Sequence, residues 1–269
     1  MQIFGYQVGR RHHGLRLESG PMDEPWFFQG SATGCLVLHG LGGTPANVRI
    51  VAQALADGGF TVHTPLLAGH GTTLEDLSKS TWRDWYRSAE EGYERLKAAG
   101  CSRIYVIGLS LGGLLSGLLA QRKALAGCGM ICPPVVMRSY LRIAALIFPL
   151  FPFAYYGNNP KKTPDPYYNM LSGMATEKLR DLEVMGKLFS RRIDQITCPL
   201  LLIEAGLDDK VSPKTFRLVG EAATQAELQM YRYPRAQHGC TYNEKTREEI
   251  ARTVLHFVRT REEGQRDSE

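Results

Sequence analysis

The sequence predicts an α/β fold in which a mostly parallel central sheet carries helices on both faces. Short apolar runs alternate with amphipathic helical stretches along most of the 269 residues, and this alternation is typical of a parallel sheet. The run Arg103–Ile107 is almost continuously apolar, as expected for a strand covered on both faces. The stretch Trp82–Ala98 repeats apolar residues along one stripe at helical spacing.

Glycines mark where several of these elements end. Gly40 follows the first strand, Gly58 and Gly59 stop the first helix, and Gly100 ends the long helix. The expected strands are short, mostly apolar runs: Cys35–His39, Phe60–His63, Arg103–Ile107, Gly129–Cys132, Leu200–Glu204 and Glu227–Tyr231. The expected helices are Ala46–Ala56, Trp82–Ala98, Leu111–Arg122 and Thr246–Arg259.

Residues 133–193 break the alternation, because they contain no clear strand. The segment opens with two prolines, holds the apolar run Ile143–Tyr156 and a proline-rich stretch, and ends in two amphipathic helical stretches. We expect an inserted cap over the carboxyl edge of the sheet. Residues 1–132 and 194–261 then form the core, and the polar residues 262–269 form a disordered tail.

Composition and charge limit the classes of protein that this chain can belong to. A chain with 43% apolar residues can bury one sizeable core. The net charge of +5 is scattered, and Lys161-Lys162 and Arg191-Arg192 are pairs rather than tracts, so we expect no nucleic-acid partner. The N-terminus lacks the apolar core of an export signal, and Pro149 and Pro152 interrupt the longest apolar run. We therefore expect a cytoplasmic protein without stable membrane insertion; a homodimer is compatible with the sequence.

The six cysteines form no CxxC pair, and no histidine follows them at zinc-ligand spacing. We expect buried, reduced thiols and no metal site. They are Cys35, Cys101, Cys128, Cys132, Cys198 and Cys240.

The segment Gly108–Gly112 fits the pattern G-x-S-x-G between an expected strand and an expected helix. In such a tight turn the serine adopts strained backbone angles, and glycines on either side remove Cβ atoms that would clash. The helix N-terminus adds partial positive charge where anionic charge develops. Ser110 is therefore the candidate nucleophile. The bare pattern arises by chance in roughly one chain in seven of this composition, so the strand–turn–helix setting carries the argument.

A serine nucleophile needs a base and an acid, and the expected order along the chain is serine, acid, histidine. Of the two histidines after Ser110, His238 lies in a loop before the last helix, whereas His256 lies inside that helix. Asp208 follows the strand Leu200–Glu204 and is the candidate acid; Asp209 and Glu204 are the alternatives.

The loop after the first strand, His39–Gly43, is rich in glycine, which lets the backbone approach a substrate at Gly40. The backbone N–H groups of Leu41 and Leu111 are the candidate oxyanion donors. His39 and His70 are expected to be structural residues. His12-His13 has no partner at ligand spacing, which argues against a metal site there.

With these segments the chain resembles bacterial carboxylesterases and monoacylglycerol lipases of the α/β-hydrolase superfamily, from Trp26 to Phe257. The resemblance implies the α/β-hydrolase fold, a triad of Ser110, Asp208 and His238, an acyl-enzyme, no cofactor, and an acyl chain held under a small cap. The matching segments are residues 36–45, 67–71 and 108–113, together with Asp208 and His238.

The expected reaction is hydrolysis of a small, uncharged, partly apolar ester. The cap is longer and more apolar than the resemblance implies, so monoacylglycerols and aromatic acyl esters of the feruloyl type both stay open, as do thioesterase, acyltransferase and peptidase activity with the same triad. A non-catalytic binding protein of this fold is the remaining alternative. Aromatic residues of the cap line the pocket or pack against the core: Phe148, Phe151, Phe153, Tyr155 and Tyr156.

Overall fold

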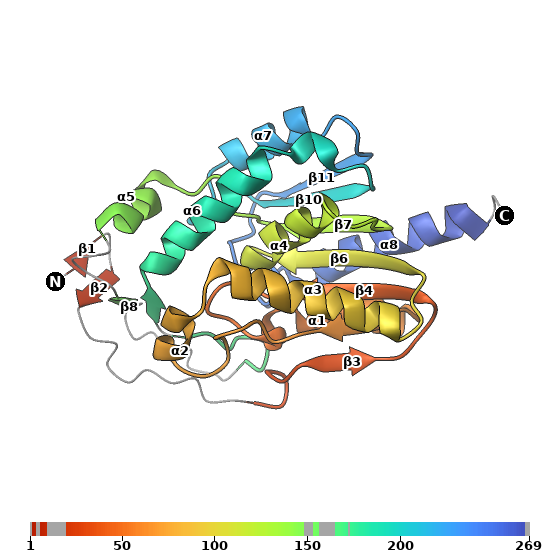
Figure 1. Cartoon of the computed structure of the whole chain (residues 1–269), viewed down its shortest axis with the longest axis horizontal. Coiled ribbons are helices and arrows are strands. Elements are labelled where there is room, and N and C mark those ends of the chain that lie inside the picture. Colours follow the sequence, from red (N-terminus) through yellow and green to blue (C-terminus); the bar gives the residue numbers. More distant parts are fainter. Residues whose placement is uncertain are drawn as a thin grey trace.

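The structure is a computed structural model (Figure 1). It describes residues 2–3, 6–9, 20–147, 153–155, 165–171 and 173–266. Its centre is a seven-stranded sheet in the order β11-β10-β7-β6-β4-β5-β3. All neighbouring strands run parallel except β3, which pairs antiparallel with β5 at one edge. The expected α/β fold is confirmed. None of the described helices is long and apolar enough to cross a membrane.

The six expected strands are present, with their ends shifted by at most two residues. The antiparallel edge strand β3 was not expected, since its three residues are too few for a pattern to show. The strands are β3 Trp26–Phe28, β4 Thr33–Leu38, β5 Thr61–Thr64, β6 Arg103–Leu109, β7 Gly127–Ile131, β10 Leu200–Ala205 and β11 Leu228–Tyr233.

Helices cover both faces of this sheet (Figure 1). Successive strand residues point to opposite faces, so Leu36 and Leu38 pack under α3 and α4, while Cys35 and Val37 pack under α1 and α8. The core helices are η1 Pro45–Val48, α1 Arg49–Asp57, α2 Leu74–Lys79, α3 Trp82–Ala98, α4 Leu111–Ala120, η2 Ile193–Gln195, α7 Lys214–Ala222 and α8 Arg247–Arg266.

Residues 133–193, for which the name cap is kept, contain helices α5 Ser139–Ile147 and α6 Glu177–Ser190. The expectation that residues 133–193 hold no strand was wrong, because β8 Phe153–Tyr155 and β9 Gly173–Ala175 lie within them. The N-terminal strands β1 Gln2–Ile3 and β2 Tyr6–Gly9 complete a separate antiparallel sheet in the order β1-β2-β8-β9. Strands β1 and β2 therefore belong to the sheet of the cap rather than to the core, as Figure 1 shows. These four strands have only two to four residues each, which is too few for an alternation of apolar and polar residues to be recognised in the sequence.

The expected disorder of residues 262–269 was wrong for 262–266, which continue α8. Glu262 accepts hydrogen bonds from the hydroxyls of Thr33 (2.6 Å) and Tyr105 (2.7 Å) and from Arg103 Nε (2.9 Å). Burial by itself would raise the pKa of the Glu262 carboxyl. The three hydrogen-bond donors have the larger effect, so the pKa lies below its usual value. A long-range polar contact therefore orders a segment that looks polar and solvated in the sequence. Residues 267–269 lie outside the described part of the chain.

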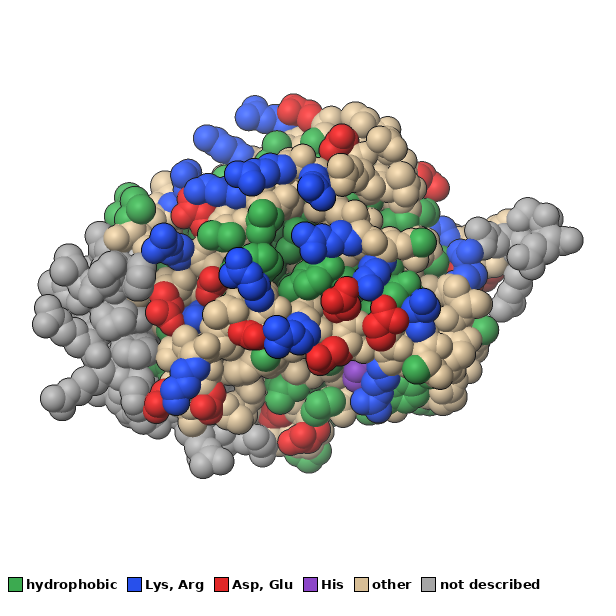
Figure 2. Space-filling view, viewed as in Figure 1, with side chains coloured by type: hydrophobic (Ala, Val, Ile, Leu, Met, Phe, Trp, Pro, Cys, Tyr) green, Lys and Arg blue, Asp and Glu red, His purple; other side chains and the backbone are tan. Residues whose placement is uncertain are grey.

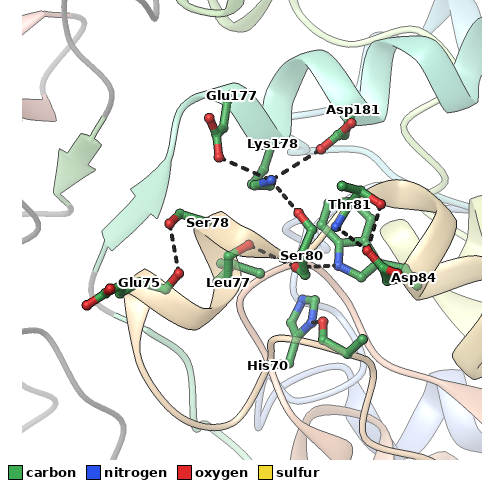
Figure 3. A network of polar contacts seen from close by, with 12 residues as sticks. His70, Glu75, Leu77, Ser78, Ser80, Thr81, Asp84, Glu177, Lys178 and Asp181 are labelled. Carbon is green, nitrogen blue, oxygen red and sulfur yellow. Dashed lines mark hydrogen bonds and ion pairs between the residues drawn. The ribbon is translucent and has the colours of Figure 1, made fainter.

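A buried lysine attaches the cap to the core (Figure 3). Lys178, near the start of α6, donates from Nζ to the carbonyl oxygen of Ser80 (2.5 Å), between α2 and α3. Its ammonium also lies 3.2 Å from Glu177 and 3.4 Å from Asp181, and only 4% of the side chain is exposed. Paired in this way, the charge is tolerated in the interior and fixes the position of α6.

Figure 2 shows basic and acidic side chains interspersed over the visible face of the molecule. The six cysteines are buried and free, as expected.

Candidate active site

The turn between β6 and α4 presents Ser110. Its backbone has φ 55° and ψ −113°, a left-handed conformation that is costly for a residue with a Cβ. The two flanking glycines make this turn possible. A Cβ on Gly108 would lie 2.2 Å from the carbonyl of Gly112, and a Cβ on Gly112 would lie 2.2 Å from Leu38 O. The strain is held in place by the strand and helix on either side, and Ser110 N donates to Ile131 O (2.8 Å).

The structure brings His238 and Asp208 to this serine. His238 Nε2 lies 2.9 Å from Ser110 Oγ, and His238 Nδ1 lies 2.8 Å from Asp208 Oδ2. The three side chains come from the ends of β6 and β10 and from the loop after β11. The carboxyl ends of these parallel strands meet at one sheet edge, which is why residues 128 positions apart come into contact.

The hydrogen bonds of Asp208 determine the tautomer of the histidine. Oδ1 accepts from the backbone N–H groups of Lys210 (2.8 Å) and Val211 (2.9 Å), which leaves Oδ2 for His238. Burial alone raises the pKa of the Asp208 carboxyl, but the hydrogen bond and charge of His238 and these two N–H groups hold it below its usual range. An ionised carboxylate only accepts, so the proton lies on His238 Nδ1 and Nε2 is free to accept from Ser110.

The alternatives for the acid and the base lie elsewhere. Asp209 is 63% exposed and pairs with Lys210 (2.9 Å). Glu204 in β10 pairs with Arg232 (3.5 Å) on the neighbouring strand β11. His256 is exposed on α8.

His39 and His70 have structural surroundings, as expected. His39 Nδ1 lies 2.9 Å from Gly40 O, and its Nε2 accepts from Leu67 N (3.1 Å). The two imidazoles stack edge to face, with ring centres 5.0 Å apart. Burial lowers the pKa of His39 to about 3 and that of His70 to about 4, so both are neutral near pH 7. His12 and His13 lie outside the described residues.

The loop after β4 approaches the serine closely. A Cβ on Gly40 would lie 3.5 Å from the Cβ of Ser110, and Leu41 lines the same cavity as Ser110. Leu111 is the first residue of α4, where backbone N–H groups have no acceptor within the helix. Both candidate oxyanion donors therefore belong to the backbone around Ser110.

Residues of the cap hold this loop in position. Leu171 N donates to Gly42 O (3.0 Å), and Asn47 Nδ2 donates to Tyr167 O (3.0 Å). Asn47 Oδ1 also accepts from Thr44 N (3.2 Å). Asn47 was missed in the sequence, where only its place three residues after Thr44 in a capping box indicated a role.

The cap also contacts the loop that carries Asp208. Arg138 Nη2 donates to Asp208 O (2.7 Å), and the Tyr140 hydroxyl donates to Asp209 O (2.6 Å). Neither residue was identified from the sequence, because a side chain that binds a distant carbonyl leaves no local pattern.

A cavity of about 90 Å³ opens over Ser110 between the core and the cap. Its walls are mostly apolar, and Gly40 lines it as expected. The other lining residues include Leu41, Leu109, Pro134, Met137, Leu141, Met170, Leu179, Leu182 and Tyr242. The aromatic residues expected here are not tested: Phe148, Phe151 and Tyr156 lie outside the described residues, and the side chains of Phe153 and Tyr155 in β8 are not described. Helical periodicity could have identified Leu179 and Leu182.

Within the described part of the chain, one group of three side chains has the composition and spacing of a metal site. It consists of Cys132, Asp208 and His238, so it shares two residues with the array at Ser110.

Relatives of known name support these observations. The chain is 30% identical to the thermostable monoacylglycerol lipase of Bacillus sp. strain H-257, over 88% of this chain and 94% of that protein. It is 26% identical to the carboxylesterase of Bacillus subtilis strain 168, over 87% and 96% of the two chains. A structure from the metagenome-derived lipolytic enzymes LipS and LipT matches with a TM-score of 0.75 at 27% identity, covering 89% of this chain and 98% of that one.

The profile of the alpha/beta hydrolase family matches residues 35–253, which include Ser110, Asp208 and His238. This span runs from within β4 into α8 and therefore covers the parallel strands, except the first two residues of β4, and the cap helices. The chain belongs to the alpha/beta hydrolase family.

Proposed function

We propose that this ester hydrolase of the alpha/beta hydrolase family cleaves its substrate through an acyl-enzyme formed on Ser110. The observation that carries the proposal is the continuous hydrogen-bonded chain from Ser110 Oγ through His238 to Asp208, with heavy-atom distances of 2.9 and 2.8 Å. A serine hydroxyl becomes a strong nucleophile only when a base at this distance removes its proton.

In the first half of the reaction, Ser110 Oγ attacks the ester carbonyl and His238 Nε2 accepts its proton. The imidazolium that forms is stabilised by Asp208, which stays ionised because its pKa is lowered. The Leu41 and Leu111 N–H groups donate to the oxyanion, and each such donor contributes about 10²- to 10³-fold to the rate. His238 then protonates the leaving alcohol.

In the second half, water takes the place of the alcohol. His238 accepts a proton from the water as it attacks the acyl carbonyl, and returns that proton to Ser110 as the acid leaves. The cap over the cavity limits the access of bulk water during both halves.

For the substrate, we propose an uncharged ester with a single aliphatic acyl chain, of the monoacylglycerol type. The apolar cavity under α5 and α6 suits one such chain, since leucine and methionine side chains from both the cap and the core line it. The similarity to a monoacylglycerol lipase supports this class. Hydrogen bonds to Gly42 O and Asp208 O hold the cap against the core, and the cavity of about 90 Å³ beneath it disfavours bulky triacylglycerols.

A substrate panel tests the proposal. Purified protein should hydrolyse monoacylglycerols and p-nitrophenyl esters with a kcat/KM at least tenfold above that for triacylglycerols, feruloyl esters, acyl-CoA thioesters and amides. Ser110→Ala and His238→Ala should remove nearly all of this activity and leave the circular dichroism spectrum unchanged. Preference for a feruloyl ester or a thioester would reject the substrate class, and activity retained in Ser110→Ala would reject the mechanism.

A further inference from the structure

A buried cysteine lies beside the Asp208–His238 pair. Cys132 follows β7 directly, with φ 48°, and only 2% of the residue is exposed. One ligand atom each of Cys132, Asp208 and His238 can be chosen so that all three lie within 4.8 Å of one another. The proposed ester hydrolysis has no use for this thiol.

A second thiol, on Cys240, lies close to the first. The two sulfur atoms are 3.8 Å apart. Two thiolates on one tetrahedral zinc ion, with Zn–S bonds of about 2.3 Å, also lie about 3.8 Å apart. The pair is therefore spaced for a shared metal ion as well as for a weak S–H···S hydrogen bond.

A small cavity lies against two of the three side chains, Cys132 and Asp208, and is not lined by His238 or Cys240. Its volume is about 20 Å³, and Val211 and the end of β10 also line it. This is roughly the space that one water molecule needs, and a divalent ion is smaller than a water molecule.

We propose that Cys132, Asp208 and His238 form a binding site for a thiophilic divalent cation such as Zn²⁺ or Cd²⁺, and that the bound cation inhibits the hydrolase. The fourth position of a tetrahedral site falls to Cys240 or to a water molecule. Sulfur, carboxylate oxygen and imidazole nitrogen are the ligands these cations prefer. The inhibitory part of the inference rests on the proposed function; the binding part does not.

The cation takes the place of the proton between Asp208 and His238. The Oδ2–Nδ1 distance of 2.8 Å has to open to about 3.3 Å for both atoms to coordinate one zinc ion, a shift of about half an ångström. Cys132 releases its thiol proton to solvent. A neutral imidazole coordinated through Nδ1 carries its own proton on Nε2. His238 then donates towards Ser110 and no longer accepts the proton of the nucleophile.

Binding is measured first, without reference to activity. Titration of the EDTA-treated protein with Cd²⁺ should produce the ultraviolet charge-transfer absorption of a cadmium–thiolate bond, with one tight site by calorimetry. Cys132→Ser and Cys132→Ala should each weaken this site at least tenfold. Cys198→Ser is the matched control. It alters a buried thiol just before the start of β10, whereas Asp208 follows the end of β10, and it should leave Cd²⁺ binding unchanged. Ser110→Ala should bind Cd²⁺ like the wild type, since the serine is no ligand.

Inhibition is measured second, with each variant compared with its own activity in EDTA. Zn²⁺ should inhibit the wild type reversibly, and EDTA should restore the activity. The zinc concentration for half-inhibition should rise at least tenfold in Cys132→Ser. Equal Cd²⁺ affinity in the wild type and both Cys132 variants would overturn the site. Tight binding at Cys132 without inhibition would overturn the proposed effect on His238, and an absence of esterase activity would count against the proposed function alone.

Discussion

His238 Nδ1 bonds to Asp208 Oδ2 over 2.8 Å, while the adjacent Asp209 points away and pairs with Lys210. Neighbouring carboxylates thus have different surroundings, one 7% exposed and the other 63%. Val211 explains the difference in exposure. Its side chain is buried, and its N–H donates to Asp208 Oδ1, so that Asp208 is turned towards the histidine.

Asp208→Asn should lower kcat by about 10³- to 10⁴-fold, because the amide no longer stabilises the imidazolium or keeps the proton on Nδ1. Asp209→Asn should change kcat less than threefold, since its ion pair is exposed. Ester hydrolysis by the two purified variants makes the comparison. A larger loss in Asp209→Asn than in Asp208→Asn would show that the acid has been assigned to the wrong residue.

Gly112→Ala should destabilise the protein by about 3 kcal/mol or more, because the new Cβ would lie 2.2 Å from Leu38 O and neither backbone can easily move. Gly264→Ala is the matched control on α8, where a Cβ meets nothing within 4 Å. It should stabilise the helix by up to about 1 kcal/mol. Urea unfolding of both variants measures the difference, and equal effects would refute the close approach at the serine turn.

His70 makes stability depend on pH. Its pKa falls from 6.5 to about 4 on folding because the ring is buried, so the unfolded chain takes up the proton first as the pH drops. The free energy of unfolding should therefore decrease between pH 6.5 and pH 4, by about 3 kcal/mol from this residue alone. Urea unfolding at pH 7 and pH 4.5 should show a smaller decrease in His70→Gln than in the wild type. His256→Gln, on the exposed side of α8, should keep the wild-type slope.

Glu262→Gln should destabilise the protein by about 2 kcal/mol, since the charged acceptor of Arg103, Thr33 and Tyr105 is lost. Glu263→Gln, at the adjacent exposed position, should cost less than about 0.5 kcal/mol. Thermal unfolding compares the two. A chain truncated after Arg261 should lose at least as much stability as Glu262→Gln; no loss on truncation would contradict an ordered end of α8.

The parallel sheet was predictable because most of its strands contain a short apolar run bounded by glycine or helix signals, as Arg103–Ile107 illustrates. The residues brought together at its edge were also predictable. Ser110 has a local pattern, and the order of Asp208 and His238 after it follows from where parallel strands end.

What could not be predicted depends on contacts between distant segments. The pairing of β2 with β8 joins residues about 145 positions apart, and nothing in either strand specifies the partner. The hydrogen bonds of Glu262 could not be predicted either. In the sequence it lies in a polar segment, and its partners Arg103 and Tyr105 are more than 150 residues away. In the site, Arg138 acts through a backbone carbonyl, and any side chain of similar reach could do so.

The central claim is that Ser110 is a nucleophile activated by His238, and covalent labelling tests it most directly. A fluorophosphonate probe should add one mass increment to the intact protein, and peptide mapping should place it on Ser110. Labelling should be abolished in Ser110→Ala and slowed at least 100-fold in His238→Ala at pH 7. Absence of labelling on the folded wild-type protein, or labelling at another residue, would contradict the account.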